Sequence, residues 1–248
     1  LHRAHASNVG VTEHFNNRGI GFLIEKEVQH LEGIIKNPKR PMIIILGGVK
    51  IKSKLRLVEK LLDRTDTILV GGGMAFTFLS ASGSSVGASI LEESMLSDAN
   101  SILNQARSRG IELVLPEDVY CGENTVNARP KGPIAINEIP DKMMGLDIGP
   151  KTLERFASAL DRAETIFWNG PVGMCELPGY ERGSEQLAIL LAKMKEMGKT
   201  VIIGGGDTVS AINKFGLNKN MSHVSTGGGA SLELMSGKPL PALQSLEV

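Results

Sequence analysis

The sequence predicts an α/β fold in which one parallel β-sheet is covered by helices on both faces. The first observation is a series of short apolar or β-branched runs, most of which end in glycine. Because parallel strands are buried on both faces, they are expected to form unbroken apolar runs of this kind. The second observation is that segments with helical spacing of apolar residues separate the runs, as right-handed βαβ crossovers require. Together these observations predict a three-layer, Rossmann-like architecture.

Six runs carry the strand prediction. They cover residues 43–46, 67–70, 111–115, 165–168, 200–203 and 223–226. All but the run at 111–115, which Pro116 stops, continue into glycine or Asn-Gly. The carboxyl ends of parallel strands share one edge of the sheet, where α/β proteins bind their ligands. Repeated glycine at that edge predicts a backbone kept clear for a ligand.

Helices are predicted where apolar residues recur at helical spacing. These segments are 21–36, 49–62, 74–79, 92–109, 151–160, 183–197 and 209–215. Gly110 and Gly198 follow two of them, in the position where helices commonly end. The connections are predicted to be less regular: an irregular start over residues 1–10, a meander or loop layer over 121–140, a turn over 144–150 and an extended tail over 238–244.

The composition is typical of a globular protein, and the charge balance does not indicate a highly charged binding partner. The chain has 248 residues, enough for one large α/β domain or two modest ones. Lys plus Arg and Asp plus Glu both number 27, so the formal net charge is zero, and this balance favours neither nucleic acid nor an acidic membrane surface. We therefore expect no nucleic-acid partner.

The low number of cysteines is typical of a protein from a reducing compartment. The two cysteines, Cys121 and Cys175, are expected to be free thiols. No run is long and apolar enough to span a bilayer, and no signal peptide is visible at Leu1. The sequence does not begin with Met, which suggests a fragment or a processed chain.

The stretch 200–215 is predicted to form a strand, a tight glycine turn and a helix. The glycines allow a sharp bend and a close approach of a ligand to the backbone amides. The helix N-terminus offers free N–H donors and a positive dipole end, which suit phosphate. Asp207 adds a carboxylate that could hold Mg²⁺ beside such phosphates. The alternative is that Asp207 only caps the helix.

A lysine cluster stands at the start of the predicted helix 49–62. Lys50, Lys52 and Lys54 lie at the helix end where the dipole disfavours cations, so either a bound anion or solvent must stabilise them. The sequence does not favour several other chemistries, because it has no P-loop, dinucleotide fingerprint, zinc motif or nucleophile elbow. Backbone donors, lysines, a carboxylate and Asn169 at a strand end remain, which is an inventory for binding a polyphosphate.

Seven motifs together resemble the phosphoglycerate kinase family, in that family's order and at closely similar spacing. They are HRAH at 2–5, GGVK at 47–50, GGGMAFTF at 71–78, MGLDIGP at 144–150, WNGP at 168–171, GGGDT at 204–208 and STGGGAS at 225–231. The resemblance covers nearly the whole chain but only the second half of that enzyme. It implies the end of the N-terminal substrate lobe at 1–20, an interdomain helix at 21–36, a nucleotide-binding domain at 37–235 and a tail at 236–248.

The resemblance also implies residue roles at the phosphates. Asp207 would hold Mg²⁺, and Lys50, Gly205 and Gly228 would act in phosphoryl transfer. The positions implied to bind nucleotide are Gly48, Lys54, Gly71, Gly72, Leu146, Asn169, Pro171, Glu176, Gly206, Asp207 and Thr208. Among these, Gly71, Gly72, Leu146 and Pro171 would wall the adenine, and Glu176 would bind the ribose hydroxyls. Without the resemblance, Glu176 reads as a solvated loop carboxylate and Asn169 as a turn residue at a strand end.

The implied partners follow from the same family. The nucleotide would be ATP or ADP, and His2 and Arg3 would face 3-phosphoglycerate or 1,3-bisphosphoglycerate, with Gly227 and Gly228 beside the transferring group. The protein would be a cytoplasmic monomer, with an organellar form left open. Two departures stand out: Ser53 occupies a commonly acidic position, and the family's substrate-binding basic cluster belongs to an N-terminal lobe outside this sequence. A non-catalytic adenine-nucleotide-binding module is therefore the alternative.

Overall fold

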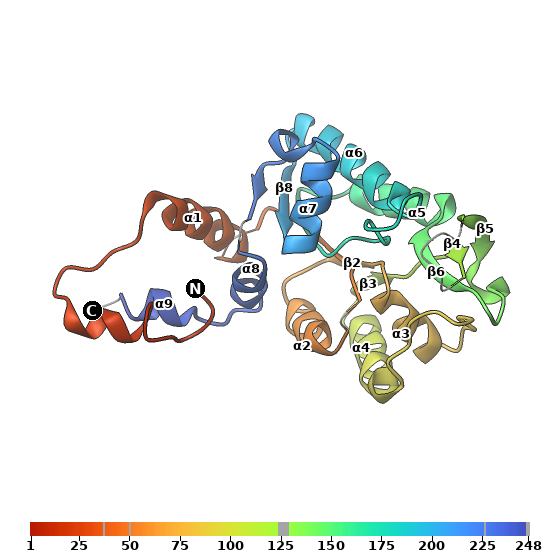
Figure 1. Cartoon of the computed structure of the whole chain (residues 1–248), viewed down its shortest axis with the longest axis horizontal. Helices are drawn as coiled ribbons and strands as arrows, with labels where there is room; N and C mark the ends of the chain where they lie inside the picture. The colour runs from red at the N-terminus through yellow and green to blue at the C-terminus, as the bar shows by residue number, and fades with distance from the viewer. Residues whose placement is uncertain (37, 50, 124–128, 226, 247–248) are drawn as a thin grey trace.

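A six-stranded parallel sheet forms the centre of the molecule (Figure 1). The computed structural model describes residues 1–36, 38–49, 51–123, 129–225 and 227–246. The strand order is β3-β2-β1-β7-β8-β9. The strands are β1 (Met42–Leu46), β2 (Thr67–Val70), β3 (Glu112–Val114), β7 (Thr165–Asn169), β8 (Thr200–Gly204) and β9 (His223–Val224). All six predicted strands are confirmed, the last of them over His223–Val224 only, with Thr226 outside the described residues, and so is the α/β fold class.

Helices cover both faces of this sheet. One layer holds α2 (Ile51–Leu61), α3 (Met74–Ala81), α4 (Leu96–Ser108) and α8 (Gly228–Met235), and the other holds α5 (Pro150–Leu160), α6 (Arg182–Glu196) and α7 (Gly206–Lys214). Successive strand side chains point to opposite faces, so Ile44 packs with the first layer while Ile43 and Ile45 pack with the second. The unbroken apolar strands are explained by this double burial.

A small antiparallel sheet stands beside the central one. Its order is β5-β4-β6, with β4 at Asp118–Gly122, β5 at Lys131–Ala135 and β6 at Met144–Ile148. The meander predicted over 121–140 is confirmed in part, whereas the turn predicted over 144–150 is wrong. Glycine and aspartate are both disfavoured in strands, which hides β6 in the sequence. Pairing with β4 overrides that preference, and Gly145 leaves room for the ring of Phe76.

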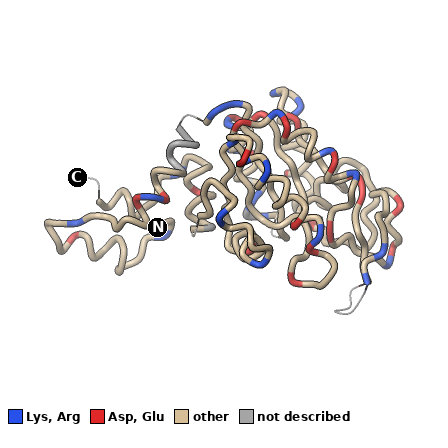
Figure 2. Tube along the Cα trace, turned by 90° about the horizontal axis from the view of Figure 1, so that it is seen from above, with Lys and Arg blue, Asp and Glu red and all other residues tan. Residues whose placement is uncertain are grey.

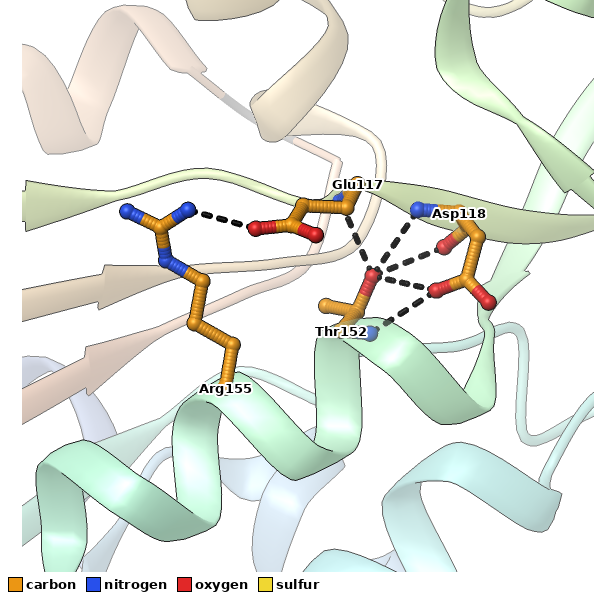
Figure 3. Close-up of polar contacts among 4 residues, drawn as sticks. All are labelled: Glu117, Asp118, Thr152 and Arg155. Atoms are coloured by element: carbon orange, nitrogen blue, oxygen red, sulfur yellow. Dashed lines mark hydrogen bonds and ion pairs between the residues drawn. The ribbon is translucent and has the colours of Figure 1, made fainter.

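Buried side-chain bonds dock the small sheet onto α5 (Figure 3). The carboxylate of Asp118 accepts the backbone N–H of Thr152 at 2.8 Å and that of Lys151 at 3.1 Å. The hydroxyl oxygen of Thr152 in turn accepts the N–H groups of Glu117 and Asp118. Arg155 and Glu117 add an ion pair at the surface. The first amides of α5, which a helix cannot satisfy itself, are thus bonded to β4.

The two ends of the chain lie together, far from the small sheet (Figure 1). The short helices η1 (Gly10–His14) and α9 (Pro241–Gln244) occupy this end, and α1 (Phe22–Lys36) runs from it to pack against α8. The N–H of Ala242 donates to the carbonyl of Leu1 at 3.2 Å. The extended tail predicted over 238–244 is wrong over Pro241–Gln244, which form α9, because Pro241 occupies a first-turn helix position where proline is tolerated.

The surface and the thiols agree with the composition. Figure 2 shows Lys and Arg interspersed with Asp and Glu along the trace. Cys121 and Cys175 are free, as expected. Both are also buried, and burial raises the pKa of each thiol to about 11. Among the described residues, no helix has both the length and the apolar character needed to cross a membrane.

Candidate functional site

The glycine-rich strand ends converge at the carboxyl edge of the central sheet. The N–H of Gly47 donates to the carbonyl of Asn169 at 2.9 Å, and that of Gly48 donates to Pro171 at 2.8 Å. A Cβ added to Gly47 would lie 2.2 Å from the Pro171 oxygen, so this glycine is needed for loop packing. At Gly206, by contrast, an added Cβ would meet nothing within 4 Å. The space kept clear therefore lies over the start of α7.

The helix α7 begins closer to the glycine turn than the sequence predicts. Gly205 has φ 90° and occupies the cap position, so the helix starts at Gly206 and includes Asp207 in its first turn. Asp207 is exposed there and does not serve as the cap. Thr208 is buried, and its hydroxyl oxygen accepts the N–H of Gly170 at 2.6 Å. Its side chain joins α7 to the turn after β7, while the first amides of α7 face the open space.

Lys54 brings a cation to the same edge. It lies in the first turn of α2, and its ammonium group donates to the carbonyl of Gly47. Burial lowers its pKa to about 8, and the nearby carboxylate of Asp207 partly opposes that shift. Because a Cβ added to Gly170 would lie 2.6 Å from the Lys54 nitrogen, glycine at that position leaves room for the ammonium group. Lys50 lies outside the described residues.

Asn169 contributes an unsatisfied donor. It ends β7 and is 2% exposed, and its side-chain nitrogen has no hydrogen-bond partner among the described residues. A Cβ added to Gly205 would lie 2.9 Å from that nitrogen, so the amide faces the glycine turn. Leaving a buried donor unpaired costs about 1–3 kcal/mol. Such a donor at the edge calls for an acceptor, and phosphate oxygens are suitable ones.

A small cavity lies on the side of the edge where the adenine wall is predicted. Gly72 and Leu146 line it together with Val172. Gly71 is packed against Val172, since an added Cβ would lie 2.7 Å from its methyl carbon. Pro171 is buried in the loop after β7, and Glu176 is exposed further along that loop. The structure thus brings Gly72 and Leu146 together.

The predicted substrate-side residues form a second group at the end of β9. An added Cβ on Gly229 would lie 2.9 Å from the ring nitrogen of His2. His2, Gly227 and Gly229 line a pocket of about 370 Å³ between the N-terminal segment, α1 and α8. Arg3 is exposed, and Gly228 begins α8. The N–H of Ser225 donates to Ile203 at 2.8 Å, which joins this group to β8.

Sequence reasoning missed the residues that hold the loop after β7. Asp147, Ser184 and Lys214 all bond to this loop or to the helix that follows it. Asp147 lies in the segment predicted as a turn, where a buried carboxyl is not expected. Lys214 ends α7 and looks like an ordinary C-terminal lysine of a helix. No local pattern in the sequence distinguishes these three.

The side chains at this edge suit a metal ion that is coordinated mainly by phosphate oxygens and only once by the protein. In the part of the chain that the structure describes, no three His, Cys, Asp or Glu residues form a metal site. Asp207 is a single exposed carboxylate beside open space and near Lys54. Mg²⁺ commonly takes one or two protein carboxylates and completes its shell with phosphate oxygens and water. The residues present therefore fit Mg²⁺ carried with a polyphosphate.

The fold and this edge define the class of protein. They are those of an α/β protein with a parallel sheet, and proteins of this class bind ligands at the carboxyl ends of their strands. The family model described as phosphoglycerate kinase matches residues 1–238. The chain belongs to the phosphoglycerate kinase family, which confirms the resemblance.

Relatives and solved structures agree. The phosphoglycerate kinase of Thermosynechococcus vestitus is 46% identical over 246 residues, which is 99% of this chain and 62% of that protein. The enzyme of Synechococcus elongatus is 47% identical and is covered to 61%. The structure of phosphoglycerate kinase from Coxiella burnetii matches with a TM-score of 0.91 at 39% identity, covering 99% of this chain and 62% of that one. The chain thus spans about 62% of the length of such relatives.

Proposed function

We propose that this chain is the nucleotide-binding half of a phosphoglycerate kinase. The whole enzyme would transfer a phosphoryl group reversibly between 1,3-bisphosphoglycerate and ADP, giving 3-phosphoglycerate and ATP. The observation that carries the proposal is the convergence of Lys54, the Asn169 amide and the start of α7 at one sheet edge. Family membership supplies the reaction, and this edge supplies groups suited to a nucleotide polyphosphate.

The phosphates would lie over the start of α7. The amides near Gly205, Gly206 and Thr208 would donate to phosphate oxygens, with the positive end of the helix dipole behind them. The Asn169 nitrogen would gain the acceptor it lacks, and the Lys54 ammonium would neutralise charge at close range. Because phosphoryl transfer needs positioning and charge stabilisation rather than a protein nucleophile, these groups suffice on the nucleotide side.

Mg²⁺ would be held by Asp207. When bound, it would supply positive charge that offsets the charge of the phosphates. This role is supported by the position of Asp207 in the first turn of α7, where the residue is exposed to solvent. Lys50 and Gly228 would contact the group in transfer, and Gly48 would border the phosphates.

The base and ribose would lie toward the small sheet. Gly71, Gly72, Leu146 and Pro171 would wall the adenine, and Glu176 would accept the ribose hydroxyls. The exposure of Glu176 and the clustering of Gly72 with Leu146 support this orientation.

The second substrate would approach from the chain-end side. His2 and Arg3, with Gly227 and Gly228, would face 3-phosphoglycerate held by an N-terminal lobe. Residues 1–20 would end that lobe, 21–36 would form the interdomain helix, 37–235 the nucleotide domain and 236–248 the tail. Closure of the lobes would exclude water from the reacting groups. The protein would be a cytoplasmic monomer.

The alternative is an adenine-nucleotide-binding module without turnover. Lys54, the Asn169 amide and the start of α7 would serve such a module equally well, because these groups suit phosphate binding and none of them is a nucleophile. The alternative and the main proposal both require nucleotide binding but differ in catalysis.

Calorimetry with Mg-ADP tests the shared requirement. Saturable binding is expected, whereas a folded protein that shows no heat at millimolar nucleotide contradicts both proposals. A coupled assay then adds the N-terminal lobe of a relative in trans. Turnover favours the enzyme, and binding without turnover favours the module.

A further inference from the structure

Asp147 is a buried carboxyl group to which the proposed function gives no role. It lies on β6, directly after Leu146, and is 2% exposed. One carboxyl oxygen accepts the N–H of Gly183 at 2.7 Å, at the start of α6, and the other accepts the N–H of Ile148 at 2.9 Å. Burial raises its pKa to about 7, with Glu181 adding to the shift and the two backbone bonds opposing it. Keeping an acid here has a cost, so it needs an explanation.

The carboxyl group is enclosed by two glycines. A Cβ added to Gly173 would lie 1.9 Å from its Oδ1, and a Cβ added to Gly183 would lie 2.5 Å from the same atom. Gly173 belongs to the loop after β7 and Gly183 to the first turn of α6. Asp147 therefore packs directly against the loop at Gly173 while it is hydrogen-bonded to α6 at Gly183.

Further bonds fasten the same stretch of loop. The Ser184 hydroxyl accepts the N–H groups of Val172 and Gly173, each at 3.1 Å. The N–H of Met174 donates to the carbonyl of Leu146 at 2.8 Å. From the other side, Lys214 donates to the carbonyl of Cys175 at 2.9 Å. All of these bonds end on residues 172–175, immediately before Glu176.

We propose that Asp147 is a positioning residue for the nucleotide. By fixing residues 172–175 against β6 and α6, it sets Glu176 where the ribose would bind and Val172 where the base would pack. Two neighbouring residues of β6 would thus contribute to the site. Leu146 would contact the base, and Asp147 would hold the loop that follows β7. This inference rests on the proposed function, because it assigns a cause to the nucleotide geometry of that site.

The test is Asp147→Asn in the full chain. The amide keeps the volume of the side chain but replaces one acceptor oxygen by a donor. Calorimetry should show Mg-ADP bound up to roughly tenfold more weakly, because binding would then have to order the released loop. The preference for ADP over 2′-deoxy-ADP should also shrink, because Glu176 would no longer be held at the ribose. A general loss of stability would not produce this second change.

The matched control is Asp118→Asn. Asp118 is 3% exposed, lies on β4 of the same sheet and likewise accepts backbone N–H groups at a helix start (Figure 3). Its variant should melt earlier but keep both the affinity and the ribose preference. If Asp147→Asn keeps them too, or if both variants lose them equally, the inference is overturned.

Two further outcomes are decisive. If Asp147→Asn does not fold, Lys214→Met releases the Cys175 carbonyl from the other side, and it should reduce the ribose preference in the same way. An unchanged preference there overturns the inference. If the folded wild-type chain does not bind Mg-ADP, the proposed function fails and the inference fails with it. Wild-type binding with unaltered variants removes the inference alone.

Discussion

Replacing Lys54 by Met removes a charge that the folded protein holds at a cost. Burial lowers the Lys54 pKa from 10.5 to about 8, even though the carboxylate of Asp207 acts in the opposite direction. The shift corresponds to about 3 kcal/mol of destabilisation while the amine is charged. Methionine keeps most of the side-chain volume but loses the hydrogen bond to Gly47, which contributes about 1 kcal/mol. We therefore expect the variant to be more stable at neutral pH by about 1–2 kcal/mol.

The pH dependence fixes the sign of this effect. The unfolded lysine keeps its proton up to about pH 10.5, and the folded lysine keeps it only to about pH 8. Between these values the unfolded chain binds more protons, so the stability of the wild type rises with pH through that window. Below about pH 8 the cost is fully present. The stability advantage of Lys54→Met should therefore disappear as the pH approaches the upper value.

Urea denaturation of both proteins at neutral pH and near pH 10 measures the effect. Lys52→Met is the matched control, because Lys52 lies on the same helix, two positions before Lys54, and is exposed to solvent. A Lys54→Met protein that is less stable at neutral pH, with a difference independent of pH, would refute the reasoning. The variant should also bind Mg-ADP more weakly. Near pH 8–9, wild-type binding should take up a proton at Lys54, seen as a buffer-dependent heat.

Three other substitutions separate binding from stability. Asp207→Asn should weaken Mg-nucleotide binding in calorimetry far more than it lowers the melting temperature, and a large loss of stability with unchanged affinity would contradict the metal role. Gly205→Ala should destabilise the folded protein by about 1–3 kcal/mol and weaken nucleotide binding. The cause is that φ at Gly205 is 90° and the added methyl group would meet the Asn169 side chain. An unchanged melting temperature and nucleotide affinity would contradict this geometry. Thr152→Val should cost about 1–3 kcal/mol in urea denaturation and leave affinity intact, since its hydroxyl joins α5 to Asp118; a loss of affinity at full stability would contradict a purely structural role.

The central sheet could be predicted because its strands carry their own signal. The run from Met42 to Leu46 is apolar throughout, since its alternating side chains enter two different cores. The phosphate end of the site could be predicted for a similar reason, because a strand, a glycine turn and a helix follow one another in the sequence around Gly205. These are local features, and local features can be read without tertiary contacts.

Features that depend on tertiary contacts could not be predicted. The strand β6 contains two residues that disfavour strands, Gly145 and Asp147, and pairing with β4 overrides their preference. The repeated glycines predict space for a ligand at the sheet edge, yet Gly47 is required by the neighbouring Pro171 carbonyl. Asp147 gave no signal because its partners, Gly173 and Gly183, are distant in sequence.

The nucleotide seat is tested most directly by the amide spectrum of the ¹⁵N-labelled chain during titration with Mg-ADP. The largest shifts should fall on the Asn169 side-chain amide and on the backbone amides of Gly205, Gly206 and Asp207, and adenosine without phosphates should leave these signals in place. Shifts confined to other surfaces, or identical shifts with adenosine, would contradict a phosphate seat at the start of α7.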